Sequence, residues 1–106
     1  MIKILEKPLS VNRVWQGKRF KTAIYKNYEQ TLIYCLPKME IPKGKLGLKV
    51  KFGFSSKKSD IDNPIKPLLD ILQKRYGFDD SQIYKLNIEK VDVAKGKEFT
   101  EFEFII

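Results

Sequence analysis

The sequence contains no histidine and only one cysteine, and these two scarcities exclude several kinds of site. Without histidine there is no His-based catalytic triad, no imidazole metal ligand and no histidine general base. The single cysteine, Cys35, can form neither an internal disulfide nor a zinc knuckle, which fits a reducing, cytoplasmic environment. Any chemistry of this chain must therefore depend on other side chains.

Long hydrophobic runs are also missing. The longest apolar stretches cover only a few residues, and residues 1–6 lack the pattern of a signal peptide, so we expect no contact with a membrane. The chain of 106 residues leaves room for a single domain, 1–106. Its hydrophobic content of 42%, with seven Phe, five Tyr and one Trp, predicts a packed globule. We expect no small-molecule cofactor.

Positive charge, by contrast, is abundant. Lysine and arginine number 21 against 13 acidic residues, which gives a net charge of +8 and a pI near 9.6. Such an excess can simply maintain solubility, but its clustering favours attraction to a phosphate backbone. The clustered residues are Lys18, Arg19, Lys21 and Lys26 in one segment and Lys57 and Lys58 in another.

Apolar periodicity predicts six regular elements. Strict alternation over residues 45–55 is typical of a half-buried strand, and apolar positions at helical spacing over 22–36 and 64–76 predict two helices. A short strand at 2–7 and two strands around 84–93 and 102–106 complete the order, with an ordered loop at 9–21. The order β–α–β–α–β–β predicts an α/β (α+β) fold with two helices over a mixed four-stranded sheet.

Local signals refine these boundaries. We expect Thr22 and Asn63 to cap the two helices and Gly77 to end the second one. Pro67 would fall at the fourth helical position, where it removes an amide that normally bonds the carbonyl of the cap residue. The change in parity of the apolar residues between positions 88 and 91 predicts a bulge near Glu89–Lys90.

Three aspartates, Asp60, Asp62 and Asp80, stand out because the rest of the chain is basic. Carboxylates repel a polyanion, so acid belongs at the centre of a phosphate-binding face only where a cation bridges the two. Asp60 and Asp62 have the period-2 spacing of an extended segment, which places both on one side. A hard cation such as Mg²⁺ takes oxygen ligands, so these carboxylates predict a metal-dependent site that acts on nucleic acid.

A helix face continues this acidic group. Lys66 lies one helical turn beyond Asp62, and Asp70 lies one turn beyond Lys66. The ammonium of Lys66 would help to stabilise a charged transition state. The same residues have an ordinary interpretation, because Asp-x-Asp-Asn before a proline is a common capping and turn sequence. Spacing alone leaves both interpretations open.

Three blocks of the sequence form a longer pattern. Residues 8–13 contain Pro-x-Ser-x-Asn-Arg, followed by Trp15 and the basic pair at 18–19; residues 60–72 read D-x-D-N-x-x-K-x-x-x-D-x-L; and residues 79–83 read D-D-x-Q-I. Together these blocks resemble the RusA-type Holliday junction resolvases, a family of small phage and prophage endodeoxyribonucleases. The second and third blocks at this separation are the specific part of the resemblance.

The resemblance implies an activity and a set of roles. It implies that Asp60, Asp62 and Asp80 ligate Mg²⁺, with Mn²⁺ as an alternative, and that Lys66 assists phosphate chemistry. It also implies a cytoplasmic homodimer, encoded by a bacterium or phage, that nicks two opposed strands of a four-way DNA junction in recombination and repair. A two-fold junction is best matched by a C2 dimer.

Other residues are assigned to support or to DNA contact. Asp70 is expected to orient Lys66, whereas Asp79 is a weaker metal candidate than Asp80. Ser10 and Asn12 would orient their loop against the acidic site or merely form a local turn, and Trp15 would stack on unpaired bases or pack inside. The supporting set is Ser10, Asn63, Asp70 and Asp79, and the DNA-contact set is Asn12, Arg13, Trp15, Lys18, Arg19, Lys21, Lys57 and Lys58.

Two other functions remain open on residues alone. One is a DNA-junction or single-strand binding protein without catalysis, in which the carboxylates are helix caps. The other is a flap or RNA nuclease with the same carboxylate site.

Overall fold

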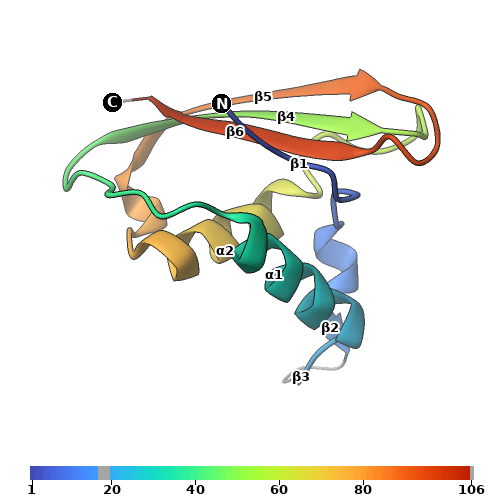
Figure 1. Ribbon diagram of the computed structural model, residues 1–106, viewed down its shortest axis with the longest axis horizontal. Coiled ribbons are helices and arrows are strands. Elements are labelled where there is room, and N and C mark those ends of the chain that lie inside the picture. Colours follow the sequence, from blue (N-terminus) through green and yellow to red (C-terminus); the bar gives the residue numbers. More distant parts are fainter. Residues whose placement is uncertain (17–19, 106) are drawn as a thin grey trace.

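The computed structural model describes residues 1–16 and 20–105, and it shows two helices on one face of a four-stranded sheet (Figure 1). The expected α+β fold with a mixed four-stranded sheet is confirmed. In chain order the elements are β1 (Ile2–Ile4), the 3₁₀ helix η1 (Val11–Arg13), β2 (Trp15–Gln16), β3 (Phe20–Lys21), α1 (Ala23–Cys35), β4 (Leu46–Phe54), α2 (Ile65–Tyr76), the 3₁₀ helix η2 (Asp80–Gln82), β5 (Ile83–Asp92) and β6 (Phe99–Ile105). No helix in this described part is long and apolar enough to cross a membrane.

The strands of the sheet lie in the order β1-β6-β4-β5. β4 pairs with β6 in antiparallel fashion and with β5 in parallel fashion, and β1 pairs antiparallel with β6. A parallel pair needs a crossover connection, and α2 supplies it between β4 and β5. β5 therefore lies at one edge of the sheet, next to the strand that leads into the acidic segment.

The alternation of β4 sorts its side chains between two environments. The residues that face the helices are all buried: Leu46, Leu48, Val50, Phe52 and Phe54. Beneath them pack Leu32 of α1 and Leu68 of α2, both fully buried. On the opposite face, a Cβ atom at Gly53 would lie 2.4 Å from the ring of Phe99, so any larger residue there would require this ring to move. Both helices therefore pack against the buried face of β4.

Helix ends follow the sequence in two cases and depart from it in one. The amide of Tyr25 donates to Thr22 Oγ1 at 3.1 Å, and Gly77 ends α2 with a φ of 74°, as expected. The predicted Asn63 cap is wrong, because α2 begins at Ile65 without a side-chain cap. Pro67 then occupies the third helical position, where an amide has no partner inside the helix, so this proline costs no hydrogen bond.

Strand boundaries needed larger corrections. β1 ends at Ile4, and the stretch read as a loop contains η1 and the short β2–β3 hairpin. The bulge predicted near Glu89 is wrong, since the irregularity in the β4–β5 ladder lies between the pairs Leu46↔Ile83 and Gly47↔Lys85. The parity change has another cause: Lys90 pairs with buried Phe52 in the ladder, and its ammonium donates to the carbonyl of residue 59 at 2.8 Å.

Candidate active site

The acidic segment after β4 is held against η1 by one backbone hydrogen bond, and a second hydrogen bond lies within the segment itself. The amide of Val11 donates to the carbonyl of Asn63 at 2.9 Å. The side-chain amide of Asn63 donates to Asp60 Oδ2 at 3.2 Å. The first and second sequence blocks, far apart along the chain, are therefore neighbours in space. Asn63 orients Asp60 instead of capping the helix.

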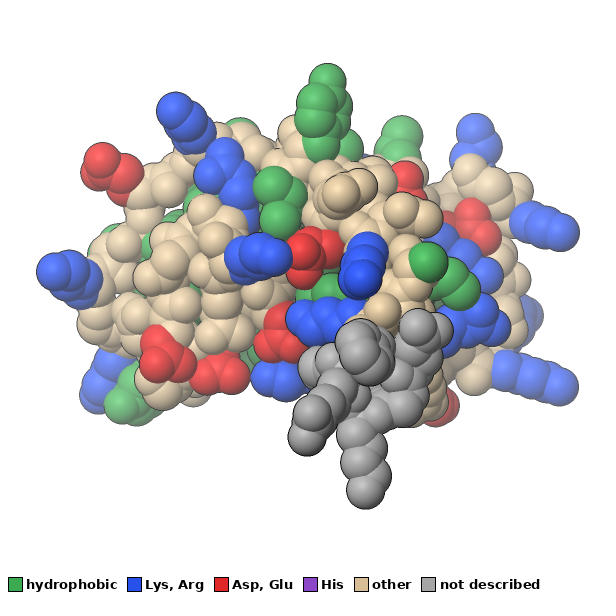
Figure 2. Space-filling model, turned by 90° about the horizontal axis from the view of Figure 1, so that it is seen from below, with side chains coloured by type: hydrophobic (Ala, Val, Ile, Leu, Met, Phe, Trp, Pro, Cys, Tyr) green, Lys and Arg blue, Asp and Glu red, His purple; other side chains and the backbone are tan. Residues whose placement is uncertain are grey.

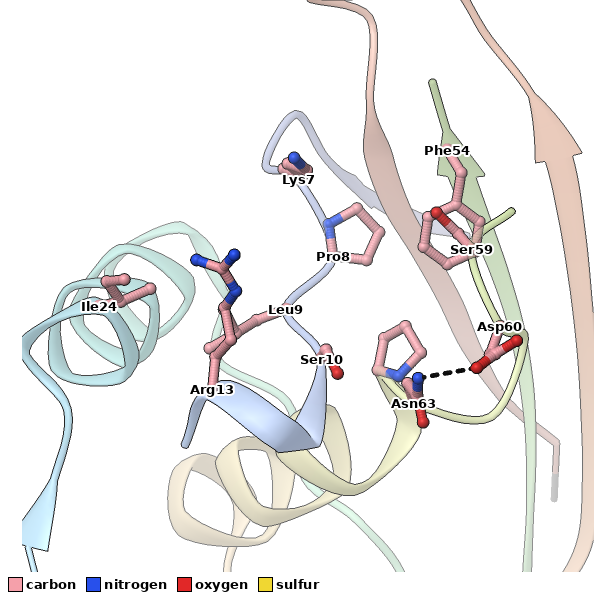
Figure 3. A pocket seen from close by; sticks show the side chains of 11 residues that line it. Lys7, Pro8, Leu9, Ser10, Arg13, Ile24, Phe54, Ser59, Asp60 and Asn63 are labelled. Atoms are coloured by element: carbon pink, nitrogen blue, oxygen red, sulfur yellow. Dashed lines mark hydrogen bonds between the residues drawn. The ribbon is translucent and has the colours of Figure 1, made fainter. Parts of the chain in front are cut away.

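A cavity of about 330 Å³ opens between these two segments and the start of α1. Figure 3 shows Arg13 on one side of it and the hydrogen-bonded pair Asp60–Asn63 on the other. Leu9, Ile24 and Phe54 supply apolar surface to the lining. The full lining is Lys7, Pro8, Leu9, Ser10, Arg13, Ile24, Phe54, Ser59, Asp60, Asn63 and Pro64. A cavity of this size with a few polar groups is typical of a small ligand site.

Lys66 lies between two carboxylates on the exposed face of α2. Its Nζ atom is 3.1 Å from Asp70 Oδ1 and 3.7 Å from Asp80 Oδ2. The hydrogen bond to Asp70 and the charge of Asp70, followed by those of Asp80, raise the pKa of Lys66. The side chain of Lys66 is 57% exposed, so a phosphate in solution can reach the ammonium. The arrangement fixes a positive charge where it remains accessible.

η2 gives the adjacent acids Asp79 and Asp80 different environments. The amide of Ser81 donates to Asp79 Oδ1 at 3.1 Å, and the amide of Asp79 donates to Gln82 Oε1 at 3.0 Å, which makes a capping box. The backbone bond from Ser81 is the first cause of the lowered pKa of Asp79. The carboxylate of Asp79 is thus occupied in the turn, whereas that of Asp80 faces Lys66.

Sequence reasoning gave no role to two glutamines that build this corner, although Gln82 stands in the third sequence block. Gln73 of α2 accepts a hydrogen bond from the amide of Asp80 through Oε1 at 2.8 Å. Gln82 also donates through Nε2 to the carbonyl of Gly44 at 2.9 Å, which ties η2 to the segment before β4. The spacing Asp-x-x-Gln is a capping-box signal and would have identified Gln82. No comparable signal points to Gln73.

The three predicted metal ligands do not converge in the described part of the chain. Among those residues, no three acidic side chains form a group that could hold a metal ion. Asp60 pairs with Asn63, Asp80 lies near Lys66, and Asp62 is exposed. The donor chemistry does fit a hard cation, because the exposed carboxylates of Asp60, Asp62 and Asp80 supply only oxygen. Joint ligation by the three aspartates stays a prediction.

Some of the expected DNA-contact residues lie near the acidic segment: Arg13 lines the same cavity as Asp60, and Lys57 and Lys58 precede it in the chain. Arg13 and Asn12 are exposed on η1, and Lys57 and Lys58 are exposed in the loop before Asp60. Figure 2 shows the helix side, where acidic side chains near the centre have basic ones beside them. The ammonium of Lys21 lies 4.5 Å from the ring centre of Tyr25. Trp15 lies in β2, and its side chain is outside the described part. Lys18 and Arg19 lie outside the described residues.

Ser10 has a local role in this arrangement. Its Oγ accepts a hydrogen bond from the amide of Asn12 at 3.2 Å and so caps η1. This contact matches the turn interpretation of Ser10. It also fixes the short helix whose Val11 amide binds the carbonyl of Asn63. Through that connection the turn helps to position the acidic segment.

Comparison with known proteins gives one family. None of the curated proteins matches the chain significantly. A family model described as Endodeoxyribonuclease RusA matches residues 8–99 of the 106. This span includes η1, the acidic segment, α2 and η2, and so contains every contact of the site described above. The chain therefore belongs to the RusA endodeoxyribonuclease family.

Proposed function

We propose that this protein is a Mg²⁺-dependent nuclease that resolves Holliday junctions by paired nicks in opposed strands, in DNA recombination and repair. The observation that carries this proposal is the position of the Lys66 ammonium, accessible and within 4 Å of both Asp70 and Asp80, in a chain of net charge +8. Membership of an endodeoxyribonuclease family implies nuclease activity on junction DNA. The metal dependence, the paired nicks and the biological role are the finer parts of the proposal.

Asp60, Asp62 and Asp80 would hold the metal ion. When bound, such an ion supplies charge neutralisation at the scissile phosphate and an activated water. Asn63 limits the rotation of Asp60 through its side-chain hydrogen bond. Gln73 holds the backbone of Asp80 through a second one. These bonds reduce the conformational freedom that two of the three ligands would lose on binding the ion.

Lys66 has the role of an electrostatic stabiliser. Its ammonium would approach a nonbridging phosphate oxygen, where negative charge develops as the new bond to phosphorus forms. Asp70 keeps this ammonium protonated and aimed along the face of α2. The compact ammonium of lysine and the planar guanidinium of arginine differ in charge distribution and donor geometry, so they are not interchangeable at this position. Asp70 is a positioning residue in this account.

DNA is held by the basic residues around the acidic segment. Arg13 at the cavity and Lys57 and Lys58 in the preceding loop are exposed and would neutralise backbone phosphates on two sides of the site. We propose the same role for Lys21 and for Lys18 and Arg19. Asn12 and Trp15 would contact the nucleotides nearest the crossover. The cation excess accounts for attraction, and the carboxylates mark where the backbone is cut.

We propose that the active form is a homodimer. A four-way junction has two equivalent scissile strands related by a two-fold axis, and a C2 dimer presents two equivalent sites to them. A domain of 106 residues buries a smaller fraction of its surface than a larger one, so an added interface would also stabilise it.

The test is Mg²⁺-dependent nicking of a synthetic four-way junction, compared with linear duplex, flap and RNA substrates of the same sequence. We expect symmetrical nicks in the junction alone, abolished by EDTA. Asp62→Asn keeps the side-chain volume and removes a negative ligand, so cleavage should fall by orders of magnitude while junction binding persists or tightens. Junction binding without nicking by the wild type would indicate a binding protein, and preferred cleavage of flap or RNA would identify another nuclease.

A further inference from the structure

We propose that β5 pairs antiparallel with β5 of a second copy of this chain, which joins the two four-stranded sheets into one. This inference names the surface of the proposed homodimer and rests on that part of the proposed function. It starts from the position of β5, which is the edge strand of the sheet order β1-β6-β4-β5 and runs for ten residues. Figure 1 shows both helices below the sheet and β5 at its margin.

The two edge strands of the sheet differ in length and in how well they are protected from pairing with another chain. At one edge, β1 is only three residues long, which is a common way to protect an edge. At the other edge, β5 is long, contains no proline, and has its irregularity at its first residues, next to Ile83. Along this strand one row of backbone amides and carbonyls points away from β4, with no strand of the described chain beyond it. Such an edge is a template for a further strand.

Exposed apolar side chains accompany this free backbone. Leu86 pairs with buried Leu48, and Ile88 pairs with buried Val50, so both lie on the helix side of the sheet. Leu86 nevertheless remains 40% exposed, because no further strand or helix covers it at the edge. Tyr84 is 69% exposed beside it. A second β5 would cover Leu86 and Ile88 from the side.

The charged residues of β5 favour one register for the pairing of two β5 strands. On the open face of the sheet the strand presents Lys85, Asn87 and Glu89 in succession. A two-fold axis at Asn87 places Lys85 opposite Glu89 of the second copy, and the symmetry repeats this pair. On the helix side the same register places Leu86 opposite Ile88 of the second copy, again twice. Opposite charges and apolar pairs directly across two strands stabilise the pairing.

Neighbouring registers lose these matches. Moving the axis to Ile88 places Leu86 opposite Lys90 of the second copy, and Lys90 is already bound to the carbonyl of residue 59. Moving it to Leu86 leaves Lys85 opposite Asn87, with no ion pair. An axis at Lys85 or at Glu89 places like charges opposite each other, which is destabilising. The sequence of β5 is therefore complementary to itself in one register.

This pairing also arranges the candidate sites. The two-fold axis of an antiparallel edge pair is perpendicular to the sheet, so the helices of both copies lie on the same side. Lys66, Asp70 and Asp80 lie on the exposed face of α2 and at η2, and both sets would face that side. One face of the dimer would then present both sites to a single junction.

Charge reversal tests the ion pairs. We would measure the dimer constant of Lys85→Glu, Glu89→Lys and the double variant by sedimentation equilibrium. Each single change replaces two attractive pairs with two repulsive ones and should weaken the dimer about tenfold or more, whereas the double variant should restore it. Lys95→Glu makes the same charge change in the turn after β5 and should leave the constant unchanged. A monomeric wild type, or single variants that match the control, would overturn the proposal.

A cysteine scan tests the register independently. In a Cys35→Ser background, which removes the one exposed thiol, Asn87→Cys should form a disulfide between copies under mild oxidation, because residue 87 faces itself across the axis. Glu89→Cys faces Lys85 and should not crosslink. Crosslinking of residue 89 in preference to residue 87 would contradict the register. Junction nicking is assayed separately. A protein that dimerises in this way but never nicks a junction would refute the proposed function and leave the interface standing. A protein that nicks junctions but does not dimerise through β5 would refute only the interface.

Discussion

Replacing Lys66 with alanine separates chemistry from stability more sharply than any other single change in this chain. The structure predicts a small effect on folding. The pair with Asp70 spans 3.1 Å between helical neighbours, and both side chains are more than a third exposed. Exposed pairs of this kind contribute about 0.3–0.5 kcal/mol. Urea unfolding of Lys66→Ala should therefore show a free energy within about 0.5 kcal/mol of wild type.

The expected effect on cleavage is much larger. If the ammonium stabilises charge that is present mainly in the transition state, its removal should slow single-turnover cleavage by about 10²–10³ fold. Junction binding should weaken by less than about tenfold, because only one phosphate contact is lost. Lys66→Arg need not restore the rate, since a planar guanidinium presents its donors differently. The measurements are the cleavage rate at saturating enzyme and the binding constant in Ca²⁺ buffer.

The same helix offers a matched control. Lys74 forms an ion pair with Glu29 at 2.8 Å, and Glu29 is the more buried of the two partners. Lys74→Ala should cost at least as much stability as Lys66→Ala and should leave the cleavage rate unchanged. A Lys66→Ala enzyme that cleaves within about twofold of wild type would show that Lys66 is only a partner of Asp70, and the electrostatic role would have to be abandoned.

Three further predictions concern DNA binding, core packing and the pH dependence of stability. Lys57→Glu with Lys58→Glu should weaken junction binding and lower its salt dependence, and an unchanged salt slope in a titration would move the DNA-binding face elsewhere. Gly53→Ala should destabilise the fold by about 1–3 kcal/mol in urea unfolding, because the new Cβ would lie 2.4 Å from the Phe99 ring; wild-type stability would show that this ring moves freely. Burial raises the pKa of Tyr28 to about 12, above its ordinary value near 10. The free energy of unfolding should therefore be unaffected by this group below pH 10 and should fall, by at most about 2.7 kcal/mol, as the pH rises towards 12. Tyr28→Phe should flatten that alkaline decline, and an equally steep decline in the variant would assign it to another group.

Local patterns predicted the elements of the fold well because their causes are local. The alternation of β4 follows from one buried face, and the Thr22 cap and the Gly77 stop each depend on a few neighbouring atoms. Lys90 shows the limit of such patterns. On the helix side of β5 its ammonium donates a hydrogen bond to a carbonyl of the loop before α2, and no pattern within β5 reveals that loop. A polar residue on the buried face that hydrogen-bonds a distant backbone group interrupts the apolar alternation, and the sequence then looks as if the strand had changed faces.

The candidate site divides along the same line. Helical spacing predicted that Lys66 and Asp70 share a face, and the structure places them in contact. The position of Asp80 depends on a hydrogen bond from its amide to Gln73, and that of Asp60 on Asn63, which sequence reasoning had assigned to a helix cap. The first bond joins η2 to α2 across the turn between them, and the second lies within the acidic segment itself, between side chains three residues apart. The sequence therefore predicted the Lys66–Asp70 pair, which helical spacing determines, but not the partners of Asp60 and Asp80, which depend on loop conformation.

The place of β6 has a consequence for biosynthesis. β6 lies between β1 and β4, and its pairing joins Ile2 to Phe102. During translation β1 and one edge of β4 must wait for the last strand of this sequence before either gains its neighbour, although α1, β4, α2 and β5 have already left the ribosome. Contacts between such distant residues also slow folding. The nascent chain therefore carries β4 with one unpaired edge until residue 105 has emerged, and an unpaired strand edge is prone to aggregation during that interval.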